Sequence, residues 1–237
     1  MHASSHAVRS LCAAAALVAC GAAQAAPVTL VKLTGLTGNP GAAGTAVYKA
    51  DLNGLGASFA AISIADVSGG FGGAAGQFSG FDLDAIKLST TDCATAACAA
   101  GAAGISVFDF LSGIVFAPGT QRAPVDPKLF GTGPAGNTVD NAVATLGLFD
   151  GFSSTLTPDG FVSLGDMGSV AFNLTSLVST AGLFLYIGEV GDNGEVAGSN
   201  IELLRNPIPE PSTYALMLGG LGAIGWLARR QRRQPAH

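Results

Sequence analysis

Short segments in which apolar and polar residues alternate recur along most of this chain. Residues Thr45–Asp51 and Ser58–Ala65 alternate in this way. A period of two indicates strands that are buried on one face. The same kind of pattern predicts strands at Pro27–Leu33, Phe78–Leu88, Ile105–Val115, Phe161–Leu164, Ser169–Leu174, Leu183–Glu189 and Val196–Leu204. Without strong helical periodicity, this spacing predicts a mainly β protein built as an antiparallel β-sandwich.

Two aspartates interrupt the strand predicted at Phe78–Leu88. Asp82 and Asp84 alternate with apolar residues and are expected to face outward. Two carboxylates about 7 Å apart along a strand are the pair that glycoside hydrolysis uses. An exposed pair without a cleft is more typical of a solvated face, so we expect no catalysis here. The buried face changes near Ala85, which predicts a bulge.

Glycine and proline mark the connections between these strands. Asp192-Asn193-Gly194 lies between two alternating segments and predicts a hairpin turn. Residues Gly119–Gly136 form a long Pro- and Gly-rich connection, and Thr138–Phe149 fits either a short helix or a strand. The Gly-rich stretch Gly69–Gly76 has neither the lysine nor the following helix of a phosphate-binding loop, so it is interpreted as a flexible loop.

The apolar ends of the chain suggest that the segment between them, Ala26–Ile208, is the exported part. It has about 183 residues, enough for one domain with a sizeable core. This segment contains fifteen acidic and six basic residues, a formal charge of −9. Such a surface repels the phosphate backbone, so nucleic acid is not expected as a partner.

The segment also lacks residues that many enzymes and binding sites need. The three histidines, His2, His6 and His237, all lie outside it, which excludes a histidine base, triad or metal ligand. The single tryptophan, Trp226, lies in the C-terminal tail, so aromatic platforms for sugars would have to come from tyrosine and phenylalanine. We therefore expect a protein that is not an enzyme.

Two cysteines remain in the exported segment, Cys93 and Cys98, in a small polar loop. In an oxidising compartment they are expected to form a disulfide that closes this loop, worth roughly 2 kcal/mol. A redox-active pair is the alternative, but the spacing is not CxxC and no basic neighbour would lower a thiol pKa.

One turn gathers oxygen-bearing side chains. Glu189, Asp192, Asn193 and Glu195 lie within seven residues and are weak candidates for calcium ligands. The spacing is not that of an EF-hand loop, and turn chemistry alone explains Asp-Asn-Gly. We therefore predict no cofactor and keep calcium as the alternative.

The C-terminus combines three features in a fixed order. Pro207, Pro209 and Pro211 predict an extended strip, and the sixteen residues Thr213–Ala228 carry no charge. A helix of that length reaches about 24 Å, which is short for a membrane span. Four arginines follow and favour a cytoplasmic end that stops transfer: Arg229, Arg230, Arg232 and Arg233.

The N-terminus has the features of a secretory signal peptide. Residues 1–10 carry Arg9 and no acid, Leu11–Ala23 is apolar, and Ala23-Gln24-Ala25 offers small residues to signal peptidase. Cleavage after Ala25 is expected. The alternative is a lipoprotein signal, because Leu17-Val18-Ala19-Cys20-Gly21 is similar to a lipobox with Cys20 as the acylated residue.

The tail motif Ile208-Pro209-Glu210-Pro211-Ser212-Thr213, its apolar span and its arginines resemble the PEP-CTERM sorting signal of Gram-negative bacteria. The resemblance implies recognition of Pro209, Glu210 and Pro211 by exosortase, a membrane protease, during export to the cell surface. The strands near Phe78–Leu88 and Phe161–Leu203 also look like exported domains that accompany such tails, which implies a jelly-roll-like sandwich without assigned catalytic residues.

Together these features divide the chain into a signal peptide (1–25), an exported β-sandwich (26–206) and a sorting signal (207–237) with a transmembrane helix at 213–228. We expect a non-enzymatic cell-surface or extracellular-matrix protein linked to exopolysaccharide and biofilm. Its partners would be signal peptidase and the secretion machinery, exosortase, the inner membrane before processing, and exopolysaccharide. The alternative is a secreted glycan- or calcium-binding module.

Overall fold

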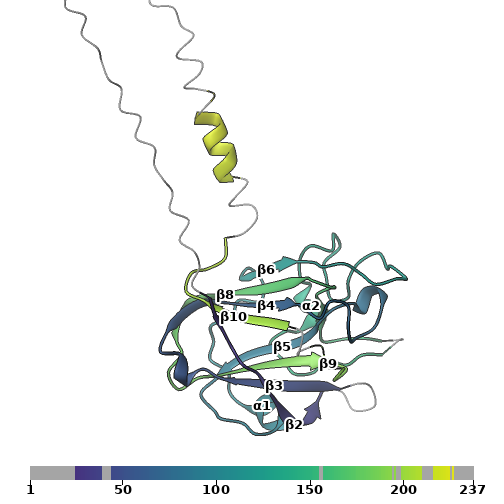
Figure 1. Cartoon of the computed structure of the whole chain (residues 1–237), viewed down its shortest axis with the longest axis vertical. Helices are drawn as coiled ribbons and strands as arrows, with labels where there is room; N and C mark the ends of the chain where they lie inside the picture. The colour runs from purple at the N-terminus through teal and green to yellow at the C-terminus, as the bar shows by residue number, and fades with distance from the viewer. Residues whose placement is uncertain are drawn as a thin grey trace, which may run out of the picture.

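The computed structural model describes residues 25–38, 44–154, 157–193, 195, 199–209, 216–224 and 226. Within these ranges, ten strands form two antiparallel sheets that pack face to face (Figure 1). The first sheet has the order β1 (Ala25–Pro27), β10 (Ser199–Leu204), β4 (Ser58–Asp66), β8 (Ser169–Ser179) and β6 (Ile114–Ala117). The second has the order β2 (Val31–Thr37), β3 (Thr45–Asp51), β9 (Phe184–Val190), β5 (Asp82–Ser89) and β7 (Val162–Ser163). The predicted antiparallel sandwich is confirmed.

The core fills the space between the two sheets. Ile62 and Ile64 of β4 and Phe172 of β8 contribute from the first sheet, and Leu185 and Ile187 of β9 from the second, all essentially without solvent exposure. These residues stand two apart along their strands, so alternation places them on one face. The period-two pattern in the sequence therefore corresponds to the buried faces.

The second sheet is also covered on its outer face. A smaller cluster there contains Leu33, Val47, Ala85, Phe149 and Tyr186, all buried. Strand β5 shifts register between Leu83 and Ile86, which confirms the predicted bulge near Ala85. Because loops cover this face, a residue that points away from the main core is still removed from water.

This covering overturns the expectation for the two aspartates of β5. Asp82 and Asp84 were predicted to face solvent, and this is wrong, since their exposed fractions are 4% and 0%. Alternation predicts one buried and one solvent-exposed face, whereas both faces of this strand are buried. The main chain of Gly151, in the loop before β7, donates to Asp84 Oδ1 at 2.9 Å.

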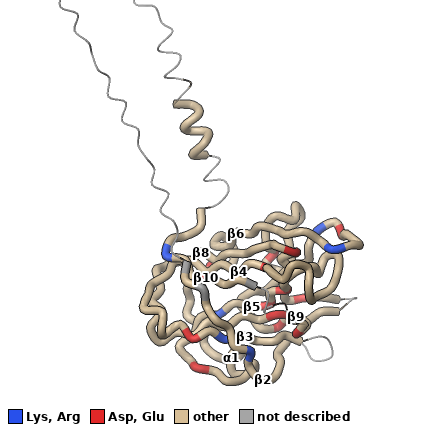
Figure 2. The backbone as a smooth tube through the Cα atoms, in the orientation of Figure 1, with Lys and Arg blue, Asp and Glu red and all other residues tan. Residues whose placement is uncertain are grey.

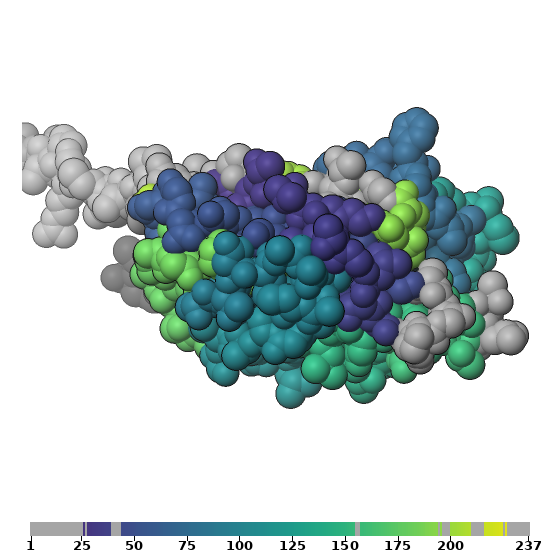
Figure 3. Space-filling view, turned by 90° about the horizontal axis from the view of Figure 1, so that it is seen from below, coloured from purple at the N-terminus to yellow at the C-terminus, as the bar shows by residue number. Residues whose placement is uncertain are grey.

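The short helix α1 (Ala96–Gly101) lies against β2 on the outer side, and Figure 3 shows this teal segment beside the purple N-terminal strands. The predicted disulfide between Cys93 and Cys98 is present and joins the preceding loop to the first turn of α1. The Tyr186 hydroxyl accepts from the Cys93 amide at 2.9 Å and donates to the Thr91 carbonyl at 2.6 Å. Tyr186 of β9 thus attaches the loop that carries the disulfide to the second sheet.

Strands β9 and β10 do not form the hairpin predicted at residues 192–194. They belong to different sheets, so the connection that contains Asp192 and Asn193 crosses from one layer of the sandwich to the other. Both Gly191 and Asp192 have positive φ, at 103° and 50°. The chain therefore turns at Gly191 and Asp192, but the strand pairing inferred from the predicted turn was wrong.

Other boundaries also differ from the sequence prediction. The strand predicted at residues 27–33 is divided between β1 and β2 in opposite sheets, and strand structure in 105–115 is confined to its last two residues, where β6 begins. The ambiguous segment 138–149 contains helix α2 (Asn141–Ala144). Two 3-10 turns, η1 (Asn53–Leu55) and η2 (Gly76–Phe78), complete the described elements of the domain.

Within the predicted transmembrane segment 213–228, residues 216–224 and 226 are helical, and the others lie outside the described residues. In the part of the chain that the structure describes, no helix combines the length and the apolar character needed to cross a membrane.

Candidate functional site

The C-terminal strip leaves the sandwich from the end of β10. Residues 205–207 and Pro209 are exposed, and Ile208 is partly buried. The side-chain amide of Asn173, in β8, contacts the main chain of Ile208 twice: Nδ2 donates to the Ile208 carbonyl at 2.9 Å, and Oδ1 accepts from the Ile208 amide at 2.7 Å. The first proline of the predicted motif therefore follows a residue that is fixed to the domain.

Glu210, Pro211 and the arginines Arg229, Arg230, Arg232 and Arg233 lie outside the described residues, as do residues 1–24 of the predicted signal peptide. Strand β1 pairs with β10 so that Ala25 lies opposite Leu204. The chain therefore enters and leaves the sandwich at the same end (Figure 1).

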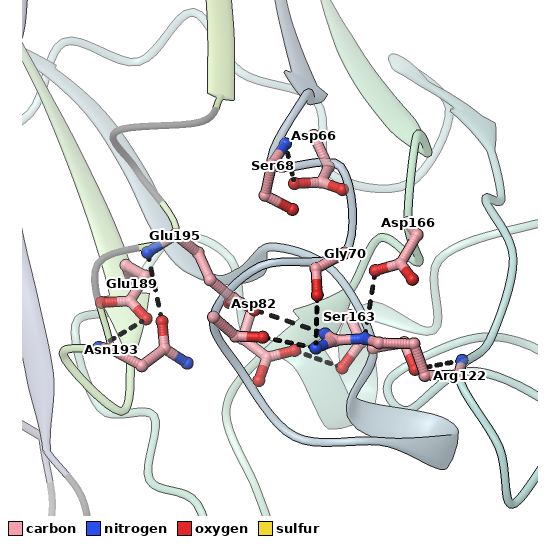
Figure 4. Close-up of polar contacts among 12 residues, drawn as sticks. Asp66, Ser68, Gly70, Asp82, Arg122, Ser163, Asp166, Glu189, Asn193 and Glu195 are labelled. Carbon is pink, nitrogen blue, oxygen red and sulfur yellow. Dashed lines mark hydrogen bonds and ion pairs between the residues drawn. The ribbon is translucent and has the colours of Figure 1, made fainter.

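A second candidate site is a group of buried carboxyls, which we call the acidic cluster: Asp82, Glu189 and Glu195. Their exposed fractions are 4%, 0% and 1%. Asp82 opens β5, Glu189 lies in β9, and Glu195 lies in the connection that follows. Acidic residues gather on β5, β9 and the adjoining loops (Figure 2). The side chain of Glu195 extends toward Arg122 beside Asp82, whereas Glu189 lies farther from the arginine (Figure 4).

Burial determines the protonation of the cluster. It raises the pKa of Glu189 to about 8, and the neighbouring Glu195 adds to the rise. Burial raises the pKa of Glu195 to about 7 against the opposing effects of Asn193 and Arg122. Burial and the neighbouring Glu195 raise the pKa of Asp82 well above its usual value, although Ser163 donates a hydrogen bond to it. Near neutral pH these carboxyls therefore hold protons that an exposed carboxyl would have lost.

Arg122 links the acidic cluster to the Gly-rich loop at residues 69–76. Its Nε lies 3.2 Å from Asp166 Oδ1, and its Nη2 lies 3.7 Å from Glu195 Oε1. Its Nη1 donates to the carbonyl of Gly72. The loop predicted from glycine content is thus attached to the cluster by an arginine that the sequence analysis had not selected.

Gly73 allows the Gly-rich loop to approach the cluster. It has a φ of +61°, and a Cβ built there would lie 1.8 Å from Glu195 Oε1. We expect Gly73→Ala to destabilise the domain by about 1–3 kcal/mol, because left-handed backbone and a steric clash both oppose it. Urea unfolding of residues 26–208 measures this loss. Gly54→Ala is the control, since Gly54 has no atom within 4 Å of its Cβ position; equal losses in both variants would contradict the account.

The predicted calcium candidates are only partly brought together. The Asn193 amide donates to Glu189 Oε1 at 3.5 Å, and the Glu195 amide donates to Asn193 Oδ1 at 3.2 Å. Asp192 instead pairs with Lys32 of β2. Across the described ranges, no group of three or more His, Cys, Asp or Glu side chains is arranged to hold a metal ion. The geometry of the acidic cluster suits proton retention and arginine pairing.

Sequence reasoning missed Arg122, Asp166 and Asn173. Arg122 had a usable signal: it is one of two arginines between residues 26 and 208 and stands inside a Pro- and Gly-rich connection. Asn173 lies between Phe172 and Leu174 in a strand, where an amide side chain is unusual. Asp166 has no comparable signal, because acidic residues are common in exposed turns.

The comparisons with known proteins concern the C-terminal strip. Residues 207–233 match the family model described as the PEP-CTERM protein-sorting motif. This confirms the resemblance stated from residues 208–213, the apolar span and the arginines. No curated protein and no solved structure matched the chain.

Proposed function

Since the chain ends in a PEP-CTERM sorting motif, which implies export and exosortase processing, we propose that its β-sandwich is a non-enzymatic component of the cell surface or extracellular matrix, associated with exopolysaccharide. The observation that carries the proposal is the position of the motif. It follows a folded domain after a few residues and leaves that domain at the end where the N-terminus enters.

In this proposal the chain acts as the substrate of sorting. Pro209, Glu210 and Pro211 present the recognition strip, residues 213–228 hold it at the membrane, and the four arginines from Arg229 to Arg233 stop transfer. Signal peptidase removes the N-terminal segment first. Cys93 and Cys98 suit this route, because a disulfide persists in an oxidising exported environment.

A non-enzymatic role agrees with the chemistry of the exported segment. It contains no histidine. Its carboxyls with raised pKa values are buried, with Asp82 hydrogen-bonded to Ser163 and Glu195 beside Arg122. A general acid must reach a substrate proton, and exposed fractions of 4% or less leave these groups no such access.

A glycan- or calcium-binding module is the second candidate, and the acidic cluster is the observation that favours it. Glu189 is fully buried, and its Oε2 has no hydrogen-bond partner among the described atoms. A cation that displaced the proton of Glu189 would neutralise the buried carboxylate and supply a partner for this oxygen. A calcium-dependent rise in the Tm of the mature protein would support this candidate, whereas no change would count against it.

Matrix association is tested by fractionating cells that do or do not make exopolysaccharide. We expect most of the mature protein to sediment with the matrix in the producing strain and to move to the medium in the non-producing strain. A chain that ends at residue 208 is the control, because it lacks the sorting motif and should reach neither fraction. Unchanged distribution between the two strains would contradict the link to exopolysaccharide.

A further inference from the structure

The contact between Asn173 and Ile208 joins the folded domain to the sorting strip. The side-chain amide of Asn173 accepts from the main-chain N–H of Ile208 at 2.7 Å and donates to its carbonyl at 2.9 Å. Pro209 follows directly and opens the sorting motif. The contact therefore resembles one rung of strand pairing, made by a side chain in place of a neighbouring strand.

The position of Asn173 explains how the strip reaches it. Phe172 and Leu174 point into the core, so Asn173 lies on the outer face of the first sheet. Strand β4 separates β10 from β8, so the chain must pass one strand to reach Asn173. Two strand spacings are about 10 Å, and the four residues after Leu204 extend over about 13 Å. The chain bends at residues 205 and 206, and the residues after Leu204 are long enough to cover the distance across β4 to Asn173.

This contact shortens the free chain between the domain and the membrane segment. From Leu204 to Thr213 there are nine residues, which span at most about 31 Å, whereas from Ile208 there are five, which span about 17 Å. A protease that binds an extended substrate typically pairs with its main chain. With Ile208 attached to Asn173, the main chain just before the motif is already paired and the domain is held close to the motif.

We propose that Asn173 is a positioning residue that holds Ile208 against the first sheet. We call this attached arrangement the closed state, and release of Ile208 from Asn173 then precedes engagement by exosortase. The inference rests on the proposed sorting function and adds an opening step to it. Two partly exposed hydrogen bonds of this kind favour the closed state by about 5- to 30-fold. The closed state is therefore easily opened, and processing slows without being blocked.

The test is a pulse–chase experiment on the full chain in its native host, with Asn173→Ala as the main variant. We expect tail removal to become about 5- to 30-fold faster. Asn200→Ala is the matched control, because Asn200 lies in β10 and its side chain bonds to Glu202 rather than to the strip. It should be processed at the wild-type rate. Processing of Asn173→Ala that is unchanged or slower would overturn the proposal.

Two further readouts separate the contact from a general structural role. Hydrogen exchange at the Ile208 amide should accelerate in Asn173→Ala while the Tm of the domain stays within about 3 °C, since the lost bonds lie at the surface. If Asn173→Ala fails to fold, Asn173→Asp replaces it. Aspartate keeps an acceptor for the Ile208 amide and loses the donor, so an intermediate rate is expected, and a wild-type rate would overturn the proposal.

Failure of the inference and failure of the sorting function give different results. If Glu210→Ala blocks tail removal while Asn173→Ala behaves as wild type, the opening step is wrong and sorting stands. If Glu210→Ala is processed normally, the sorting function itself is wrong.

Discussion

The exported domain should lose stability as the pH rises from 5 to 8. Burial raises the pKa of Glu189 to about 8 and those of Glu195 and Asp84 to about 7, from usual values near 4. The folded domain therefore binds more protons than the unfolded chain between these values, and the free energy of unfolding decreases with pH in that window. The stabilisation is fully present below about pH 4 and is lost once the pH passes about 8.

The expected effect is large for a domain of this size. A loss of about 2 kcal/mol or more between pH 5 and pH 8 lowers the Tm by roughly 4–8 °C. Calorimetry of residues 26–208 at a series of pH values measures it. Glu189→Gln should flatten the profile, because the amide is neutral at every pH. Glu202→Gln, on β10 and away from the acidic cluster, is the control and should keep it. A Tm that rises over this range would contradict the burial argument.

Glu210→Ala should abolish removal of the C-terminal tail. Glu210 supplies the single charge between residues 206 and 228 and stands in the sequence between two prolines, whose fixed φ favours an extended main chain. A recognition site built for a carboxylate loses both the charge and its hydrogen bonds when alanine replaces it. We expect at least about a 100-fold slower reaction, which corresponds to about 3 kcal/mol, and the unprocessed chain should remain in the membrane fraction.

A matched substitution tests whether loss of the Glu210 charge, rather than any change in the strip, slows removal of the tail. Ser212→Ala lies two residues further along the same strip and removes a polar group without removing a charge. Its processing should stay close to that of the wild type. Equal loss in both variants would indicate general sensitivity of the strip and would argue against recognition of Glu210.

The sandwich was predictable because its strands keep a period of two. Ile62, Ile64 and Phe172 face the core as their spacing requires. The outer covering of the second sheet was not predictable, because it depends on loops such as the one around Gly151, which contacts Asp84 from 67 residues away. Alternation along a strand indicates which residues share a face, but it does not indicate whether that face is exposed to solvent.

Long-range pairing limited the prediction of the sites in the same way. The acidic cluster brings Asp82 together with Glu189 and Glu195 from much later in the chain, and Arg122 contacts it from a third segment. Residues 192–194 have the composition of a hairpin turn, but the connection that contains them joins the two sheets. Turn residues favour a change of chain direction and do not determine which strand the chain enters next. The sorting motif was predictable because its residues are contiguous in the sequence, so a local pattern is enough to identify it.

The central claim is that this chain is exported and processed by exosortase at its C-terminal motif. Intact-mass analysis of the protein from its native host, with and without exosortase, tests this most directly. We expect the native host to yield a product that lacks both the N-terminal segment and the residues beyond the Pro-Glu-Pro motif. The host without exosortase should yield a chain that retains His237. A tail-less product of the same mass from both hosts would contradict the account.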